Sequence, residues 1–301
     1  MSATANALGN RRVPNALLTW YFVLMWGSGF VATKAGLQYA APFTFLSLRF
    51  AFGVLCMGLV VAITRPHWPQ GARQWRHVVV AGLLMHAVNL SGSHYAQYLG
   101  LSAGITALLL ATQPLLTAAW IAWRSHQTPS KLQWLGLVVG LAGVVFVVGH
   151  KIDVRTMTMQ SLAAVAVSLL AITSGTLYQR RHIPDVDLRA ATFVQFVVSL
   201  IVLAPLAMVV EGAKVHWSWT MAVSIVYLVI GASILAVGAL HVLMRRGEAT
   251  RVTSLLYLTP AIAVATEWAI FGVVPTLMSA IGIVITSAGV ALVSARPCRA
   301  D

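Results

Sequence analysis

The sequence contains little charge. Charged residues make up 9% of the 301 positions, and only seven of them are acidic, whereas a typical soluble domain carries about 25% charged residues. Cysteine is also scarce, since Cys56 lies in an apolar stretch and Cys298 in the basic tail. These shortages exclude an ordinary soluble domain, a disulfide framework and a cysteine metal site.

Long apolar runs are what the sequence has instead. Hydrophobic residues make up 59% of the chain, and the runs approach the roughly 20 residues that a helix needs to cross a bilayer. They do not alternate in polarity as barrel strands do. The sequence therefore predicts an all-α integral membrane protein of ten transmembrane helices. The predicted segments are Ala16–Gly36, Pro42–Ile63, His77–Tyr98, Gly104–Trp123, Leu132–Gly149, Gln160–Tyr178, Ala190–Val210, Trp219–Leu243, Val252–Phe271 and Thr276–Ser294.

The net charge of +13 comes from basic residues in the short gaps between these runs. If the N-terminus is cytoplasmic, 15 of the 20 Lys and Arg residues lie inside, 4 lie outside and Arg49 lies within a helix. This bias follows the positive-inside rule and places both termini in the cytoplasm. We therefore expect a multi-pass protein of the plasma membrane, a bacterial inner membrane, whose basic loops face lipid headgroups and not nucleic acid.

The chain repeats itself at an offset of 146 residues. The pairs that match at this offset are Pro114 with Pro260, Pro129 with Pro275, Gly136 with Gly282, Gly143 with Gly289, Gly92 with Gly238, Ser28-Gly29 with Ser174-Gly175, Phe50 with Phe196, and Lys34 with Arg180. Each half holds five predicted helices, and because five is odd the second half enters the membrane from the opposite side. We therefore predict two inverted repeats. The predicted layout is a tail over 1–15, a first repeat over 16–150, a second over 160–295, and a tail over 296–301.

Several motifs occur in a fixed order. The first helix reads Trp26-Gly27-Ser28-Gly29-Phe30 with Lys34 after it, Pro42 to Arg49 open the second helix, and Ala111-Thr112-Gln113-Pro114 and Leu258-Thr259-Pro260 place prolines in the fourth and ninth. This arrangement resembles the drug/metabolite transporter superfamily, in particular its ten-helix EamA-type branch. The resemblance implies a central cavity and movement of amino acids, other metabolites or drug-like compounds, often outward. Members often carry an acid just before the fifth and tenth helices, where this chain has Gln127 and Val273.

A polar stripe follows the third predicted helix. His86, Asn89, Ser93 and Gln97 recur at three- and four-residue spacing, which places them on one helical face. They are candidates for lining the substrate path, because polar groups inside a bilayer usually face a cavity or another helix. The alternative is that they hydrogen-bond neighbouring helices.

Two central prolines are candidate hinges. Pro114 and Pro260 each remove a backbone donor from a helix, and the freed carbonyls can bind a ligand. Gly27 and Gly29 permit a bend or a close helix approach beside Trp26. A static kink and core packing are the alternatives at these places. The further substrate-binding candidates are Trp26, Thr112, Gln113, Ser174, Tyr178, His241, Tyr257 and Thr259.

Three charges fall within predicted helices, namely Lys34, Arg49 and Glu267. Glu267 could accept a proton in a coupling cycle, or pair with Arg49 or Lys34 as an outer gate. Against this, long side chains near helix ends can reach the headgroups. We carry the three residues forward as candidates for coupling or gating.

Together these features predict a secondary transporter that works by alternating access, with a small metabolite as its partner. A passive channel is the alternative, and saturable exchange would distinguish the two. No His-Glu-x-x-His motif or phosphate-binding loop is present, so we expect neither an enzyme, a cofactor nor a metal. Gly136 and Gly140 could serve either a helix contact within a monomer or a homodimer surface.

Overall fold

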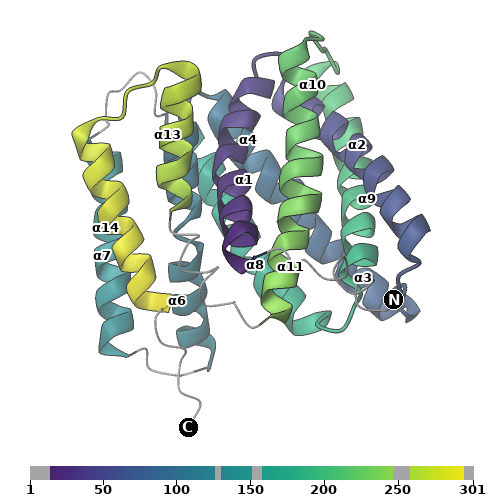
Figure 1. Ribbon diagram of the computed structural model, residues 1–301, viewed down its shortest axis with the longest axis horizontal. Helices are drawn as coiled ribbons and strands as arrows, with labels where there is room; N and C mark the ends of the chain where they lie inside the picture. Colours follow the sequence, from purple (N-terminus) through teal and green to yellow (C-terminus); the bar gives the residue numbers. More distant parts are fainter. Residues whose placement is uncertain (1–13, 126–129, 151–157, 247–257, 295–301) are drawn as a thin grey trace, which may run out of the picture.

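The computed structural model describes residues 14–125, 130–150, 158–246 and 258–294, and these ranges are almost entirely helical (Figure 1). The first half contains α1 (Asn15–Gly36), α2 (Pro42–Thr64), α3 (Gly71–Gly82), the π-helical segment η1 (Leu83–Val88), α4 (Asn89–Tyr98), α5 (Ala103–Leu110), α6 (Gln113–Ser125) and α7 (Lys131–His150). The second half contains α8 (Met159–His182), α9 (Leu188–Leu206), η2 (Ala207–Glu211), α10 (Trp219–Val226), η3 (Tyr227–Ala236), α11 (Val237–Arg245), α13 (Thr259–Phe271) and α14 (Leu277–Ser294).

Six described helical stretches are long and apolar enough to cross a membrane, which confirms a membrane protein by length and composition. They are Asn15–Gly36, Pro42–Thr64, Ala103–Ile121, Met159–His182, Leu188–Glu211 and Trp219–Leu240. The other predicted segments correspond to α3–η1–α4, α7, α13 and α14, so the count of ten crossings stays a prediction. The third helix begins at Gly71, six residues earlier than expected, and the start of the ninth, before Leu258, lies outside the described residues.

Polar side chains begin several of these helices. Thr158 and Ser161 form a reciprocal capping box at the start of α8, and Asp187 caps α9 through the Arg189 N–H. Ser218 caps α10 in the same way. These side chains satisfy backbone donors that have no partner within the helix, which fixes where each helix begins.

Many contacts between the helices come in symmetric pairs: shifting each helix to its equivalent at the 146-residue offset turns one contact into the other. The α4–α8 contact has its counterpart in α1–α11, η1–α8 in α1–η3, and α1–α13 in α6–α8. Two further pairs, α2 with α9 and α7 with α14, each join an element to its own equivalent. Figure 1 shows α7 beside α14 at one end of the bundle and α2 near α9 at the other. A two-fold relation between the halves produces this pattern.

Individual residues obey the same relation. A Cβ on Gly143 would meet Thr286, and one on Gly289 would meet Gly140, so α7 and α14 run antiparallel. The two contacts become one another when 146 is added to one residue and subtracted from the other. Phe50 and Phe196, a pair matched in the sequence, lie 5.5 Å apart between ring centroids. Equivalent residues that touch lie close to the two-fold axis.

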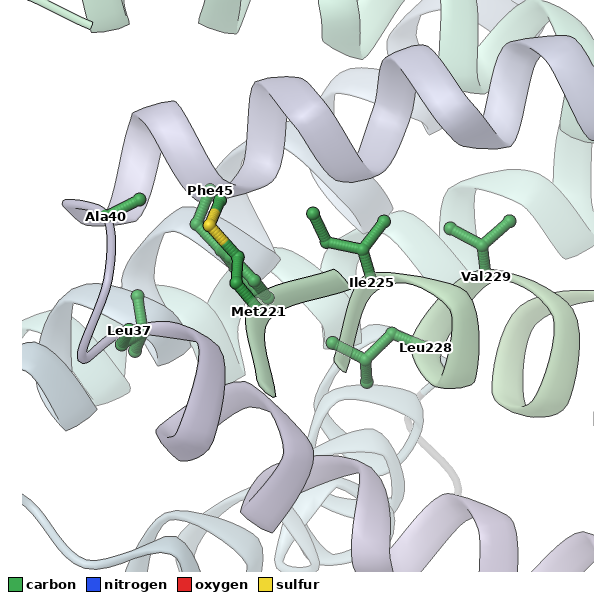
Figure 2. Packing of buried hydrophobic residues seen from close by; sticks show 7 residues of the cluster. All are labelled: Leu37, Ala40, Phe45, Met221, Ile225, Leu228 and Val229. Carbon is green, nitrogen blue, oxygen red and sulfur yellow. The ribbon is translucent and has the colours of Figure 1, made fainter. Parts of the chain in front are cut away.

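One buried cluster holds the α1–α2 turn against α10 and η3 (Figure 2). Phe45 is fully buried at its centre, and Met221 reaches it from α10. A Cβ on Gly36 would overlap the Phe45 ring, so only glycine fits there. Because lipid is as apolar as these side chains, close packing and not removal from water stabilises such contacts. The labelled residues of the cluster are Leu37, Ala40, Phe45, Met221, Ile225, Leu228 and Val229.

Candidate functional site

Glu267 joins three helices at one end of the bundle. Its carboxylate on α13 lies 2.6 Å from Lys34 Nζ on α1 and accepts hydrogen bonds from the Ala103 and Gly104 backbone N–H groups at the start of α5, at 3.2 and 3.0 Å. The side chain of Glu267 is only 3% exposed. The ammonium group and the helix N-terminus both attract the carboxylate, since a helix N-terminus carries partial positive charge. We call this arrangement the Glu267 latch.

The sequence suggested two basic partners for Glu267, namely Lys34 and Arg49. Glu267 pairs with Lys34, whose ammonium group also lies 5.0 Å from the centre of the Phe271 ring. Arg49 lies elsewhere on α2 and donates from Nη2 to Ser233 Oγ on η3 at 3.3 Å. Any role of the three charges in coupling or gating stays a prediction.

A second carboxylate caps α2, and the sequence reasoning missed it. Glu211 accepts hydrogen bonds from the Phe43 and Thr44 backbone N–H groups at 3.0 and 2.8 Å, and from Thr44 Oγ1 at 2.7 Å. The available signal was an acid immediately after an apolar run. Its partner is 167 residues away in the chain, which no local pattern reveals.

The polar stripe of the third helix divides between two neighbours. His86 Nε2 lies 3.2 Å from Gln195 Oε1 on α9, whereas Asn89 accepts hydrogen bonds from Ser168 on α8 at its side-chain and backbone oxygens, at 2.8 and 2.7 Å. His86 lies in η1, where hydrogen bonds run from i to i+5, so the 3.6-residue spacing does not hold across it. The contacts of Asn89 are those of a helix interface.

The far end of the stripe is buried. Ser93 is 2% exposed and donates to the Leu90 backbone oxygen of its own helix at 3.1 Å. Gln97 is 7% exposed, and its Oε1 has no hydrogen-bond partner in the described structure. A buried amide oxygen without a partner is costly, so this atom is available to a solute. Whether the stripe lines a substrate path stays a prediction.

Pro114 coincides with a real break. The predicted fourth helix divides into α5 and α6 at Ala111 and Thr112, directly before the proline. Thr112 Oγ1 donates to the Leu109 oxygen at 2.6 Å, and Gln113 Nε2 donates to Thr176 Oγ1 on α8 at 3.1 Å. Side chains thus engage groups at the break, as expected where a proline interrupts the backbone ladder.

Pro260 lies in the first turn of α13, a position that proline tolerates. Thr259 beside it is 5% exposed, and its Oγ1 lacks a partner in the described structure. A Cβ on Gly27 would lie 2.8 Å from the Ile262 side chain and 3.1 Å from the Thr259 oxygen, so α1 approaches α13 closely there. Gly29 has more room, with Leu228 at 3.6 Å. Tyr257 lies outside the described residues.

The remaining candidates lie on α1, α8 and α11. Trp26 is 43% exposed and tilted against Phe22 at 5.5 Å. Ser174 donates to the Leu170 oxygen of its own helix. Tyr178 lies at the end of α8, where its hydroxyl is 2.6 Å from His77 Nδ1. His241 belongs to α11, but its side chain is outside the described part. Their part in substrate binding stays a prediction.

Asp187 and Arg189 form an ion pair at the start of α9. In the turn before α9, the Arg189 guanidinium hydrogen-bonds Asp187 and holds the pKa of that carboxyl below its ordinary value. Within the described ranges, no group of three or more His, Cys, Asp or Glu side chains could hold a metal ion.

Comparison with known proteins fits this architecture. The EamA-like transporter family model matches the chain twice, over residues 15–149 and 159–295. The chain is 27% identical over 279 residues to the uncharacterized transporter YdfC of Bacillus subtilis strain 168, covering 88% of this chain and 86% of that protein. It is 25% identical to the uncharacterized inner membrane transporter YedA of Escherichia coli strain K12, covering 83% and 79%.

Two further likenesses cover nearly the whole chain. A Salmonella typhimurium protein named "Probable amino-acid metabolite efflux pump" is 22% identical, with 91% of this chain and 93% of that protein covered. A solved crystal structure superposes with a TM-score of 0.65 at 19% identity, covering 93% of this chain and 96% of that one, which shows the fold. With two matches that together span most of its residues, the chain belongs to the EamA-like transporter family.

Proposed function

We propose that this protein is a secondary transporter that carries a small metabolite through a central cavity between two inverted repeats. In this proposal ten helices cross a bacterial inner membrane and both termini are cytoplasmic. The positive-inside bias of the loops supports the orientation. Membership of a transporter family and the transporter names of its relatives support the activity.

The observation that carries the proposal is that contacts between the halves come in symmetry-related pairs. Because several contacts of one half have a counterpart in the other, we expect each half to be able to adopt the arrangement of its partner. Exchange of the two arrangements would open the cavity first to one side and then to the other. The Glu267 latch would hold the end near Lys34 closed in the arrangement described here.

Amino acids or similar amphipathic solutes are the proposed cargo, and export is the proposed direction. The name of the Salmonella relative, an amino-acid metabolite efflux pump, supports both. Monomer and homodimer both fit the proposal.

Counterflow in liposomes that contain only this protein tests the activity. Vesicles loaded with an unlabelled amino acid should accumulate the same labelled amino acid transiently, and excess unlabelled solute outside should abolish the signal. Uptake that rises in proportion to concentration, without saturation or counterflow, would support a passive channel instead. Absence of any flux across a broad panel of metabolites would overturn the proposal.

A further inference from the structure

Arg49 carries a positive charge that no carboxylate in the described part of the chain neutralises. It lies in α2, inside a stretch long and apolar enough to cross a membrane, and its side chain is half-buried. Its hydrogen bond to a described residue runs from Nη2 to Ser233 Oγ at 3.3 Å. A guanidinium has five N–H donors, so most of its capacity remains for another partner.

The described carboxylates within the bundle are committed elsewhere. Glu267 binds Lys34 and the start of α5, and Glu211 binds the start of α2. Asp187 pairs with Arg189 beside α9. None of the carboxylates in the described ranges lies within ion-pair distance of Arg49. A cation inside a bilayer is costly without an anionic partner, and such residues commonly mark the path of a substrate.

The second repeat shows that the fold does not require this charge. At the 146-residue offset the equivalent of Arg49 is Gln195, which follows Phe193 and Val194 and precedes Phe196. Gln195 donates to Gln179 Oε1 at 3.0 Å and lies 3.2 Å from His86 Nε2. A neutral amide therefore fills the same position with two protein partners, whereas the hydrogen bond from the guanidinium to Ser233 engages one of its five donors.

His94, which packs against α2, has a second buried polar atom without a partner in the described structure. Its ring lies 6.0 Å from that of Phe45, four residues before Arg49 on the same face of α2. The side chain is 3% exposed, and Nδ1 lies 3.3 Å from Ser93 Oγ. Nε2 has no hydrogen-bond partner in the described structure. A buried nitrogen without a partner is uncommon and fits a group that a solute engages.

We propose that Arg49 binds the carboxylate of the transported solute, so that the substrates are carboxylate-bearing metabolites such as amino acids. The planar guanidinium matches a carboxylate with two parallel N–H···O bonds. The solute supplies the counter-charge that the described residues do not provide. This inference rests on the proposed transport function and names its substrate class.

Matched pairs of ligands test the inference on the unaltered full-length protein. Purified protein in detergent is heated with each standard amino acid and, separately, with the corresponding amino-acid amide, which keeps the side chain and ammonium group but has no carboxylate. Ligands that bind the folded state raise the unfolding temperature. At least one acid should do so, and its amide should not.

Variants then assign the effect to Arg49. Arg49→Gln copies the side chain of the second repeat and should weaken binding of the stabilising acid by roughly 10- to 100-fold, the range for hydrogen bonds to a charged group. Arg49→Lys keeps the charge but not the planar guanidinium with its two parallel donors. It should therefore bind more weakly than wild type but still prefer the acid to the amide. Arg73→Gln removes an exposed cation of α3 and serves as the control, with wild-type binding expected.

The outcomes separate this inference from the transport function. If an amide binds as well as its acid, if no amino acid stabilises the wild type, or if Arg49→Gln binds the acid as the wild type does, the Arg49 assignment is overturned. Should Arg49→Gln fail to fold, Arg49→Lys and the acid–amide comparison decide the matter. Saturable counterflow of a solute without a carboxylate would overturn the inference while leaving the transporter intact; absence of all flux would overturn the transporter.

Discussion

The two repeats share a backbone but differ in chemistry. Gly143 and Gly289 make equivalent helix contacts, and Phe50 meets Phe196 near the two-fold axis. The π-helical segments η1 and η3 also overlap when one is shifted by 146 residues. The polar groups do not follow this symmetry. Packing at these contacts therefore uses the same small and aromatic residues in both halves, while the charged and hydrogen-bonding residues diverge.

The difference is clear at two charged positions within the helices. Arg49 corresponds to Gln195, as described above, and Glu267 corresponds to Ile121. Lys34 corresponds to Arg180, so a cation occurs in both halves but a buried carboxylate has no equivalent. One end of the bundle thus has an ionic closure that the offset does not reproduce at the other. A carrier built in this way would favour the arrangement in which the latched end is closed.

The largest expected effect comes from removing the latch. Glu267→Ala should lower the free energy of unfolding by about 3 kcal/mol, because it leaves Lys34 without its partner and two backbone donors uncapped. Lys34→Met should cost less, since Glu267 keeps its bonds to the start of α5. Chemical denaturation in detergent measures both. Unfolding of Glu267→Ala at the wild-type denaturant concentration would show that the latch contributes nothing.

A pair of equivalent glycines gives the next largest effect. Gly92→Ala places a Cβ 2.6 Å from the Ala164 oxygen on α8 and should destabilise the protein by about 1–3 kcal/mol through overpacking. Gly238→Ala, at the matching position, meets no atom within 4 Å and should be neutral or slightly stabilising, because alanine favours a helix. Thermal unfolding compares the two. Equal losses would contradict the described contacts.

Helix caps provide a smaller test of the same comparison. Asp187 caps α9 itself, whereas the matching residue before α2 is Ala41, which has no capping side chain, and Glu211 supplies the cap from the other half. Glu211→Ala should therefore cost about 1–2 kcal/mol, in the upper range for a cap. Asp187→Ala should cost less, because Asp187 accepts one backbone hydrogen bond and Glu211 accepts two. A larger loss for Asp187→Ala in denaturant unfolding would reverse this ranking.

The smallest effect concerns pH. Arg189 lowers the pKa of Asp187 in the folded protein, so the stabilisation from this carboxylate is present above its unfolded pKa, about 3.9, and disappears as the pH falls through the lower folded value. Asp187→Asn should therefore flatten the acid limb of the stability profile slightly and leave the neutral region parallel to wild type. An unchanged acid limb would show that the ionised Asp187 carboxylate does not contribute to stability.

The sequence predicted the helices well because a membrane-crossing helix has a strong signal in length and composition. The spaced glycines Gly136 and Gly140 left open an internal helix contact or a dimer surface, and the structure places them against Gly289 of α14. The polar groups were harder to place. His86 and Asn89 look like members of one stripe, but η1 turns them toward different helices. Glu211 and the Lys34–Glu267 pair join residues far apart in the chain, and no local spacing encodes such partners.

The central claim is that the two repeats have opposite orientations in the membrane, and the exposed turns after α1 and α8 test it most directly. Gln38 and Pro184 occupy these turns and are equivalent at the 146-residue offset. Each is changed to cysteine in a chain whose Cys56 and Cys298 are alanine, and a membrane-impermeant maleimide is applied to intact cells and to inside-out vesicles. The account predicts labelling of Gln38→Cys from outside the cell and of Pro184→Cys only in inside-out vesicles. Labelling of both from the same side would contradict the inverted repeat.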